Sequence, residues 1–223
     1  MLLGRSGSGK TTTLKLINCL LTPSEGQLRI DGRPTTEWDV IRLRRRIGYA
    51  IQEGGLFPHY TVWDNVALIP KLERWPAGKI AARVEEVLRW VGLPPDPYAK
   101  RYPHQLSGGQ RQRVGLARAL AGDPPILLMD EPFGALDPIT RSELQQEFKQ
   151  LQERLGKTVV FVTHDVGEAL MLGDRIALMD SGKLAGIYSP SEFLNSTNND
   201  NDNAAKPYLD IFRASRQLLN PQG

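Results

Sequence analysis

The chain has 223 residues, of which 40% are hydrophobic and 24% are charged, and its net charge at pH 7 is +3. This composition is typical of a soluble globular protein with a sizeable core, in one domain or two small ones, and the weak charge does not indicate a nucleic-acid partner. No apolar run approaches the roughly 20 residues that cross a bilayer, the N-terminus lacks the pattern of a signal peptide, and the single cysteine, Cys19, excludes an internal disulfide.

The first motif is GRSGSGKT, from Gly4 to Thr11, which fits the phosphate-loop pattern of a Gly, four free positions and Gly-Lys-Ser/Thr. Glycines let main-chain N–H groups approach a phosphate closely, Lys10 supplies a positive charge for the outer phosphates, and the Thr11 hydroxyl is a ligand for Mg²⁺. A helix predicted over 10–21 points its positive end at the bound anion. The alternative is an ordinary glycine-rich turn.

Two short strands are predicted after this loop, over 27–31 and 47–51. A phosphate loop itself follows a strand, and only three residues precede Gly4, so we expect the first strands of the sheet to be absent from this sequence. A cluster of arginines precedes the second strand and forms either a solvated helix face or a surface for an anionic partner. Its members are Arg42, Arg44, Arg45 and Arg46.

The segment 54–123 is predicted to be a helical subdomain inserted into an α/β core that comprises 1–53 and 124–194. Apolar residues recur at helical spacing over 62–69 and 79–91, and several prolines divide the segment into pieces.

A second glycine-rich helix start, Leu106-Ser107-Gly108-Gly109-Gln110, lies in this subdomain. Ser107 is a natural N-cap, and the two glycines leave the first backbone N–H groups of the helix open. The motif therefore predicts a second anion-binding helix end, with a plain glycine-rich helix start as the alternative.

Two buried strands are predicted in the second half of the core. An apolar run over 126–129 ends in Asp130-Glu131, and another over 158–162 is followed closely by His164. Ligands bind at the carboxyl ends of strands in open parallel sheets, so we expect these polar residues at a ligand site. The other predicted elements are a helix capped by Asp137 and stopped by Gly156, a hairpin of strands over 175–179 and 183–188, a flexible linker over 195–203 and a helical tail over 204–223.

The run LSGGQRQR resembles the signature of ATP-binding cassette (ABC) ATPases, and the phosphate loop, ILLMDE and VTH stand around it in the order of that family. The resemblance covers nearly the whole chain. It implies the fold of a P-loop NTPase, with a mostly parallel RecA-like sheet that lacks its first strands and an inserted helical subdomain. It also implies that ATP and Mg²⁺ bind, and that two copies of the chain sandwich two ATP molecules.

The resemblance assigns roles by position in the motifs. Glu131 is the candidate general base, and Gln52 and His164 are the further catalytic residues at the γ-phosphate. Thr11, Asp130 and Gln52 hold Mg²⁺ in this assignment. The nucleotide-binding residues are Gly4, Ser6, Gly7, Gly9, Lys10, Thr11 and Thr12 in the phosphate loop, Ser107, Gly108, Gly109 and Gln110 in the signature of the partner copy, and Asp137 in the loop that links the two sites.

Two longer stretches, GLFPHYTVWDNVALIPKLERW at 55–75 and DEPFGALDPITRSELQ at 130–145, resemble the ATPase subunits of bacterial importers for glycine betaine, choline and related osmoprotectants. This resemblance implies a peripheral protein at the cytoplasmic face of the membrane. Its implied partners are a second ATPase subunit, transmembrane permease subunits and, indirectly, a solute-binding protein, with no nucleic acid. Four residues are expected either to receive the permease or to pack inside the helical subdomain: Phe57, Pro58, Tyr60 and Trp63.

Other interpretations stay open: an ABC ATPase for another small solute, a non-transport ABC ATPase of DNA repair or translation, and a degenerate module. A small-molecule kinase shares the phosphate loop but has no use for the signature helix. Because the adenine-stacking aromatic of the family lies upstream of the phosphate loop, we expect this chain as written to bind ATP weakly. The residues after Tyr188 are too few for the regulatory domain pair that many betaine-importer ATPases carry.

Overall fold

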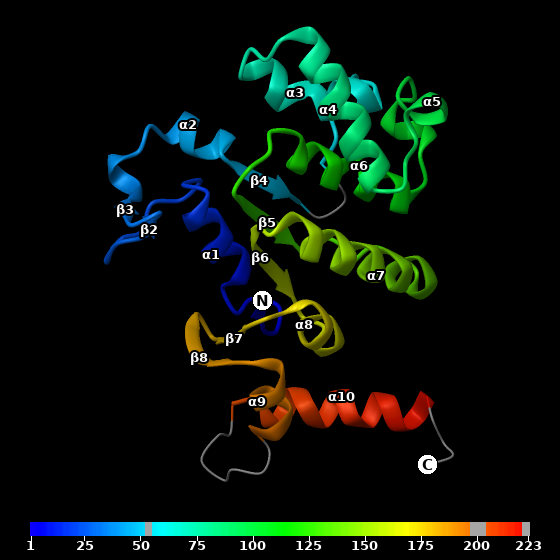
Figure 1. Ribbon diagram of the computed structural model, residues 1–223. Coiled ribbons are helices and arrows are strands. Elements are labelled where there is room, and N and C mark those ends of the chain that lie inside the picture. The colour runs from blue at the N-terminus through cyan, green and yellow to red at the C-terminus, as the bar shows by residue number, and fades with distance from the viewer. Residues whose placement is uncertain (52–54, 197–203, 220–223) are drawn as a thin grey trace. The chain divides into compact units, whose positions relative to one another are not determined.

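The computed structural model describes residues 1–51, 55–196 and 204–219, with side chains as far as Ala214 in the last range. Helices and mostly parallel strands alternate along the chain (Figure 1). This arrangement confirms the predicted α/β class.

Contacts divide the chain into two compact units. Unit 1 consists of Met1–Thr13 with Phe161–Gly223, and unit 2 consists of Leu14–Val160. The division passes through one helix and one strand, α1 (Lys10–Ile17) and β6 (Thr158–Thr163). The predicted boundaries of the helical subdomain, at 54 and 123, both lie inside unit 2 and stay a prediction.

The strands of unit 1 are built around β1 (Leu2–Leu3), which precedes the glycine-rich loop. β1 pairs in parallel with the end of β6 on one side and with β7 (Ile176–Asp180) on the other. β8 (Lys183–Tyr188) pairs antiparallel with β7, which confirms the predicted hairpin. A two-residue strand is thus held between two longer neighbours.

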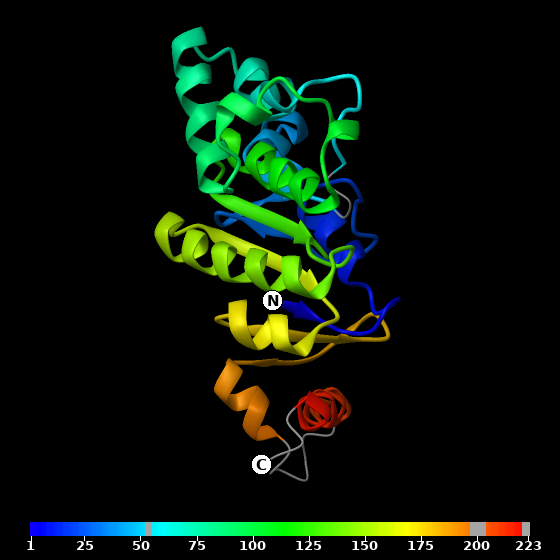
Figure 2. The ribbon, with the colours of Figure 1, turned by 90° about the vertical axis from the view of Figure 1, so that its right-hand side faces the viewer.

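A buried apolar cluster holds unit 1 together. It joins β1 and β7 to three helices: α8 (Val166–Leu172), α9 (Pro190–Asn195) and α10 (Lys206–Leu219). α9 begins at a capping box, because the Ser189 hydroxyl accepts the N–H of Glu192 at 3.2 Å while the Glu192 carboxylate accepts the N–H of Ser189 at 2.7 Å. Figure 2 shows α10 end-on beside α9.

In unit 2, β4 (Ile47–Ala50) and β5 (Ile126–Asp130) pair in parallel. Three successive residues of β5, Leu127 to Met129, are almost completely buried, as predicted for a strand that is covered on both faces. The N–H of Thr158, at the start of β6, donates to the carbonyl of Pro125 at 3.2 Å, just before β5. Two further strands form a separate small hairpin, β2 (Arg29–Ile30) and β3 (Arg33–Pro34).

Besides two short 3-10 helices, Thr35–Glu37 and Pro103–Gln105, six α-helices lie entirely within the described part of unit 2. They are α2 (Val40–Arg45), α3 (Val62–Leu72), α4 (Ala77–Trp90), α5 (Pro95–Tyr98), α6 (Gly108–Ala121) and α7 (Pro138–Leu155). α3 and α4 pack on α6 (Figure 1), and the contact surface is fully buried at Val66, Val84 and Leu120. α7 has the predicted cap at Asp137 and ends at Gly156, which is left-handed with φ 58°.

Most predicted elements differ from the structure by one or two residues at an end, and the elements with a larger total difference include α1, β2 and α3. α1 stops at Ile17 rather than at 21 because Cys19 turns left-handed, with φ 52°, in the position that glycine usually takes. The N–H of Leu20 then donates to the carbonyl of Lys15 at 2.8 Å and closes the helix. The strand predicted over 27–31 is only two residues long, and α3 continues through Pro70. Most of the predicted linker lies outside the described residues.

Candidate nucleotide-binding site

The glycine-rich loop between β1 and α1 is folded as a cradle for an anion. Gly7 and Gly9 have φ of 79° and 97°, a region that side-chain-bearing residues rarely enter. Gly4 is required for a different reason, since a Cβ there would lie 2.3 Å from the carbonyl oxygen of Met179 on β7. The loop is also tied to the β7–β8 turn, because the N–H of Gly182 donates to the carbonyl of Ser8 at 3.2 Å.

Lys10 is held inside this cradle. Its side chain is only 5% exposed, and its ammonium donates to the carbonyls of Gly4 and Arg5, each at 2.9 Å. A buried ammonium needs such acceptors. The Ser8 hydroxyl oxygen is buried in the same loop and has no hydrogen-bond partner among the described residues. Ser8 was not among the predicted site residues, although it occupies a free position of the motif.

His164 lies at the level of this loop in unit 1. Leu3 and Thr163 face each other across β1 and β6, so Gly4 and His164 are the next residues along two neighbouring parallel strands. The His164 side chain is exposed. The structure therefore brings together the predicted phosphate-loop residues and the predicted γ-phosphate histidine, as expected for strands that end at one edge of a sheet.

A buried carboxylate that sequence reasoning missed shapes the turn around His164. Glu168, on α8, is only 6% exposed, and its carboxylate accepts the hydroxyl of Thr163. That hydroxyl oxygen accepts the N–H of Asp165 at 2.9 Å, and the Asp165 carboxylate accepts the N–H of Glu168 at 3.2 Å. These bonds fix the backbone on both sides of His164. A sequence signal existed only in the spacing of Asp165 and Glu168, which suits a helix N-cap.

Asp130 is the last residue of β5 in unit 2, and Glu131 follows it directly, as predicted. The Tyr49 hydroxyl, on neighbouring β4, hydrogen-bonds the Asp130 carboxylate. Burial, and then the negative charge of Asp130, raise the pKa of Tyr49 to about 12. Tyr49 is thus a neutral donor that orients Asp130. Sequence reasoning did not single it out.

Glu131 adopts a strained backbone conformation at the start of the following turn. Its φ is 44°, which costs a residue with a side chain about 1–3 kcal/mol. The N–H of Gly134 donates to the Glu131 carbonyl at 3.1 Å and closes the turn. Such conformations persist where the surroundings impose them, and they concentrate at functional sites.

The signature motif forms the N-terminus of α6. The Ser107 hydroxyl accepts the N–H of Gln110 at 3.2 Å, and the Gln110 side-chain oxygen accepts the N–H of Ser107 at 3.0 Å, so a capping box confirms the predicted N-cap. The Gln110 amide also donates to the hydroxyl of Tyr98 on α5 at 3.3 Å. Tyr98, another residue that the sequence did not indicate, therefore anchors the motif.

The N-terminus of α7 lies against the signature. Asp137 caps α7 by accepting the N–H of Thr140 at 3.0 Å, and this bond holds the pKa of the Asp137 carboxyl below its usual value. A Cβ on Gly109 would lie 2.9 Å from the methyl of Thr140 and 3.7 Å from the side chain of Leu136. Two helix N-termini, both predicted to contact nucleotide, therefore form one surface of unit 2.

Residues 1–134 of the chain match the family described as ABC transporter. The chain belongs to this family. A solved structure supports the same assignment: the ATP-binding cassette MJ0796, determined as a dimer in a post-hydrolysis state with ADP and Pi, is 39% identical and superposes with a TM-score of 0.76 over 85% of this chain and 84% of its own. The predicted resemblance and the predicted P-loop NTPase fold are thereby confirmed.

Two curated relatives within the ABC family have names that specify the transported solute. The glycine betaine/carnitine/choline transport ATP-binding protein OpuCA of Bacillus subtilis is 54% identical over 97% of this chain and 55% of its own length. The glycine betaine uptake system ATP-binding protein YehX of Escherichia coli is 51% identical over 90% of this chain and 65% of its own length. The chain spans about half to two thirds of the length of these relatives.

Not every predicted residue of this ABC protein is described. Gln52 lies outside the described residues, so its predicted role at Mg²⁺ and the γ-phosphate stays a prediction. The other predicted residues fall into two groups, one in each unit: the phosphate loop with His164 in unit 1, and Asp130, Glu131, the signature and Asp137 in unit 2. Within the part of the chain that the structure describes, no helix is long and apolar enough to cross a membrane.

A groove of about 280 Å³ lies in unit 2 between β4, α3 and α6. Of the four residues expected either to receive a permease or to pack inside the helical subdomain, Phe57 lines this groove and is 42% exposed. The Arg118 guanidinium lies over the Phe57 ring, 5.9 Å from its centre, and donates to the carbonyl of Gly55 at 2.8 Å. Burial lowers the pKa of Arg118.

The loop that carries Phe57 is fixed from beneath by Asn65. This side chain is fully buried, and it accepts the N–H of Phe57 at 2.8 Å. Its amide donates to the carbonyls of Phe57, Tyr60 and Thr61 at 3.1, 3.2 and 3.0 Å. One buried amide therefore holds an exposed aromatic at the edge of the groove. Neither Asn65 nor Arg118 was predicted from the sequence.

Proposed function

We propose that this chain is the ATP-hydrolysing subunit of an ABC importer for osmoprotectants of the glycine betaine and choline type. The observation that carries the ATPase part is the enclosed Lys10 in a glycine cradle, with His164 at the same level of the neighbouring strand. The similarity to OpuCA and YehX supports the solute class. The reaction is ATP + H₂O → ADP + phosphate.

In this proposal the phosphate loop binds the β- and γ-phosphates. The main-chain N–H groups of the loop and the N-terminus of α1 supply donors, and Lys10 exchanges its carbonyl partners for phosphate oxygens. His164 contacts the γ-phosphate. Phosphoryl transfer requires little covalent chemistry from the protein, so positioning and charge stabilisation account for most of the rate.

Mg²⁺ is the implied metal, and the residues suit it. It prefers oxygen ligands, and the Thr11 hydroxyl and the Asp130 carboxylate are of that kind. Bound with the nucleotide, Mg²⁺ neutralises charge on the β- and γ-phosphates. The assignment of Thr11, Asp130 and Gln52 as its ligands stays a prediction from the motifs.

Glu131 is the proposed general base. It orients the attacking water and takes its proton, a role that contributes about 10²–10⁴-fold in rate. The left-handed backbone at Glu131 supports this assignment, because strained backbone conformations concentrate at functional sites.

A second copy of the chain completes each site in this proposal. The adjoining N-termini of α6 and α7 are helix ends of the kind that binds anions, and they belong to unit 2, whereas the phosphate loop belongs to unit 1. A two-fold dimer lets each copy offer this surface to the nucleotide on its partner's phosphate loop. MJ0796 has been solved as a dimer with ADP and Pi.

The membrane partner is proposed to dock at the groove beside Phe57. An exposed aromatic ring, a guanidinium over its face and a rigid loop are the features of an interaction anchor. In this proposal a short helix of the permease fills the groove, and the chain stays peripheral at the cytoplasmic face of the membrane.

Two variants test the ATPase proposal. Lys10→Ala is expected to lose nucleotide binding, while Glu131→Gln is expected to keep binding and to lose about 10²–10⁴-fold in phosphate release. Glu143→Gln, which changes an exposed carboxylate on α7, is the matched control and is expected to hydrolyse ATP normally. Normal phosphate release by Glu131→Gln would show that Glu131 is not the base.

Transport tests the rest of the proposal. The chain is co-expressed with the permease and solute-binding protein of a glycine betaine importer, and uptake of labelled glycine betaine is measured at high osmolarity. Phe57→Ala is expected to reduce uptake while leaving the ATPase activity of the isolated chain intact. Leu72→Ala, which changes an exposed apolar residue that does not line the groove, is expected to change neither uptake nor ATPase activity. Equal uptake by wild type and Phe57→Ala would move the docking site elsewhere.

A further inference from the structure

The C-terminal helix α10 reaches the phosphate loop. The hydroxyl oxygen of Tyr208 accepts the backbone N–H of Arg5 at 3.3 Å, across 203 residues of sequence. The carbonyl of Arg5 accepts the ammonium of Lys10 at 2.9 Å. Arg5 is therefore held through its N–H by the C-terminal helix and through its C=O by the lysine of the phosphate loop.

α10 is docked firmly enough to act as a support. Ala205 and Leu209 are fully buried in the apolar cluster of unit 1, together with Leu3 of β1 and Ala169 of α8. The Tyr208 ring packs against the same cluster. Burial of a leucine side chain such as Leu209 stabilises the folded protein by about 1.5–3 kcal/mol, so the position of the helix does not depend on one polar contact.

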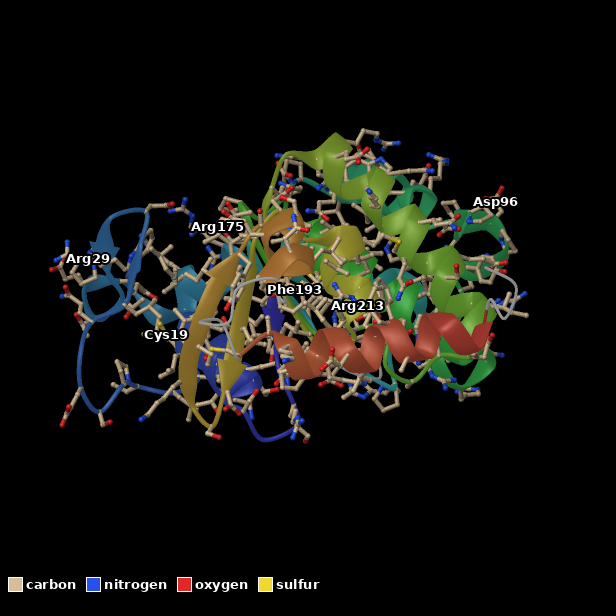
Figure 3. The ribbon with its side chains drawn as sticks, turned by 90° about the horizontal axis from the view of Figure 1, so that it is seen from below. Cys19, Arg29, Asp96, Arg175, Phe193 and Arg213 are labelled. Atoms are coloured by element: carbon tan, nitrogen blue, oxygen red, sulfur yellow. The ribbon has the colours of Figure 1, made fainter. Side chains whose placement is uncertain are left out.

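Further contacts tie α10 to the two elements beside it. The Phe212 ring lies 3.6 Å from the point where a Cβ would project from Gly167, in the first turn of α8 just after His164. The Arg213 guanidinium donates to the carbonyl of Leu194 on α9 at 3.2 Å, and Figure 3 shows Arg213 on α10 near Phe193 of α9. α10 thus contacts the first residues of the phosphate loop and the helix that follows the γ-phosphate histidine.

We infer that Tyr208 is a positioning residue for the phosphate loop and that α10 thereby tunes the affinity for nucleotide. The inference rests on the proposed function, since it concerns the same phosphate site. The physical argument is preorganisation: a loop whose entry is already fixed loses less conformational freedom when it closes on a phosphate. A tyrosine suits this task because its packed ring fixes where the hydroxyl acceptor lies.

A simpler role for Tyr208 is to cover apolar surface, and the hydroxyl separates the two roles. Tyr208→Phe removes the acceptor and keeps the ring. One neutral hydrogen bond is worth about 0.5–1.5 kcal/mol, so we expect the dissociation constant for MgADP to rise about 2- to 10-fold. Because the ring remains, the melting temperature of the nucleotide-free protein is expected to fall by no more than the loss of this one hydrogen bond costs, about 1–6 °C for a chain of this length.

The experiment titrates MgADP by calorimetry into the full chain and into two variants. The control, Tyr102→Phe, removes the hydroxyl of a tyrosine in unit 2 that is 40% exposed, and is expected to bind as wild type does. MgADP affinity in Tyr208→Phe equal to that of wild type would overturn the inference while leaving the proposed function intact. Wild-type protein that binds no MgADP would overturn both. A lower melting temperature with unchanged affinity would assign Tyr208 to packing alone and would equally overturn the inference.

Discussion

Substitution of Gly4 tests directly how the phosphate loop is held against β7. Its position leaves no room for a methyl group, because a Cβ would lie 2.3 Å from the carbonyl oxygen of Met179 and 2.6 Å from the Ser8 hydroxyl oxygen. The Ser8 side chain can rotate, but the Met179 carbonyl belongs to the backbone of β7, which pairs with β1. Gly4→Ala must therefore move either the loop or the strand.

The size of the effect follows from that geometry. A carbon–oxygen contact of 2.3 Å has to open by about 1 Å to become ordinary, and a well-packed site resists such overpacking by about 1–3 kcal/mol. For a chain of this length each kcal/mol lowers the melting temperature by about 2–4 °C, so a decrease of about 2–12 °C is expected. MgATP affinity should fall as well, since the displaced carbonyl of Gly4 accepts the ammonium of Lys10.

Gly78→Ala is the matched control. Gly78 lies in the first turn of α4, no atom lies within 4 Å of a Cβ built there, and its φ is not in the left-handed region. Alanine favours a helix over glycine by about 0.5–1 kcal/mol, so this variant should be slightly more stable than wild type and bind MgATP normally. The two variants are compared by urea unfolding and nucleotide titration. A Gly4→Ala protein as stable as wild type would refute the argument that the Met179 carbonyl excludes a side chain.

Two further predictions concern stability. Leu209→Ala, in the fully buried part of α10, should cost about 2–5 kcal/mol by urea unfolding, and a loss under 1 kcal/mol would mean that the helix is not docked as described. The carboxyl pKa of Asp123 is lowered, first because Lys157 donates a hydrogen bond to it and also because Lys157 and Arg83 are positively charged. The ionised carboxylate therefore stabilises the folded protein above the unfolded carboxyl pKa, and this contribution disappears as the pH falls through the folded pKa. Asp123→Asn should therefore be less stable than wild type by up to about 1 kcal/mol at pH 7 and equal to it near pH 2, and a pH-independent difference would contradict this ion-pair origin.

Features with short-range causes were predictable from the sequence. The cap of α7 at Asp137, the capping box of α9 and the stop at Gly156 each depend on residues within one helical turn, and all three are present in the structure. The glycine-rich loop was predictable for a similar reason, because glycine readily adopts the positive φ that Gly7 and Gly9 have and other residues rarely do. The position of β5 followed from its continuous apolar pattern, because a strand that is covered on both faces needs no alternation.

Features that depend on distant contacts were not predictable. Arg5 and Tyr208 meet across 203 residues, and neither residue type indicates the other. From the sequence, Glu168 is indistinguishable from an exposed helix residue, because its burial depends on how α8 packs in the folded protein. Cys19 ends α1 in a left-handed conformation that residues other than glycine rarely adopt, so the helix was predicted to be too long.

The position of the phosphate loop depends on both chain segments of unit 1, Met1–Thr13 and Phe161–Gly223. β1 has only two residues, and so short a strand is marginal without neighbours. Its neighbours are β6 and β7, and the side chain of Leu3 is fully buried in a cluster that is completed by Leu209 of α10 and by Ala205 just before that helix. The N-terminal loop is therefore supported by residues close to the C-terminus. A substitution in α10 that opens this cluster acts on β1, and through β1 on the cradle that encloses Lys10, without touching a nucleotide.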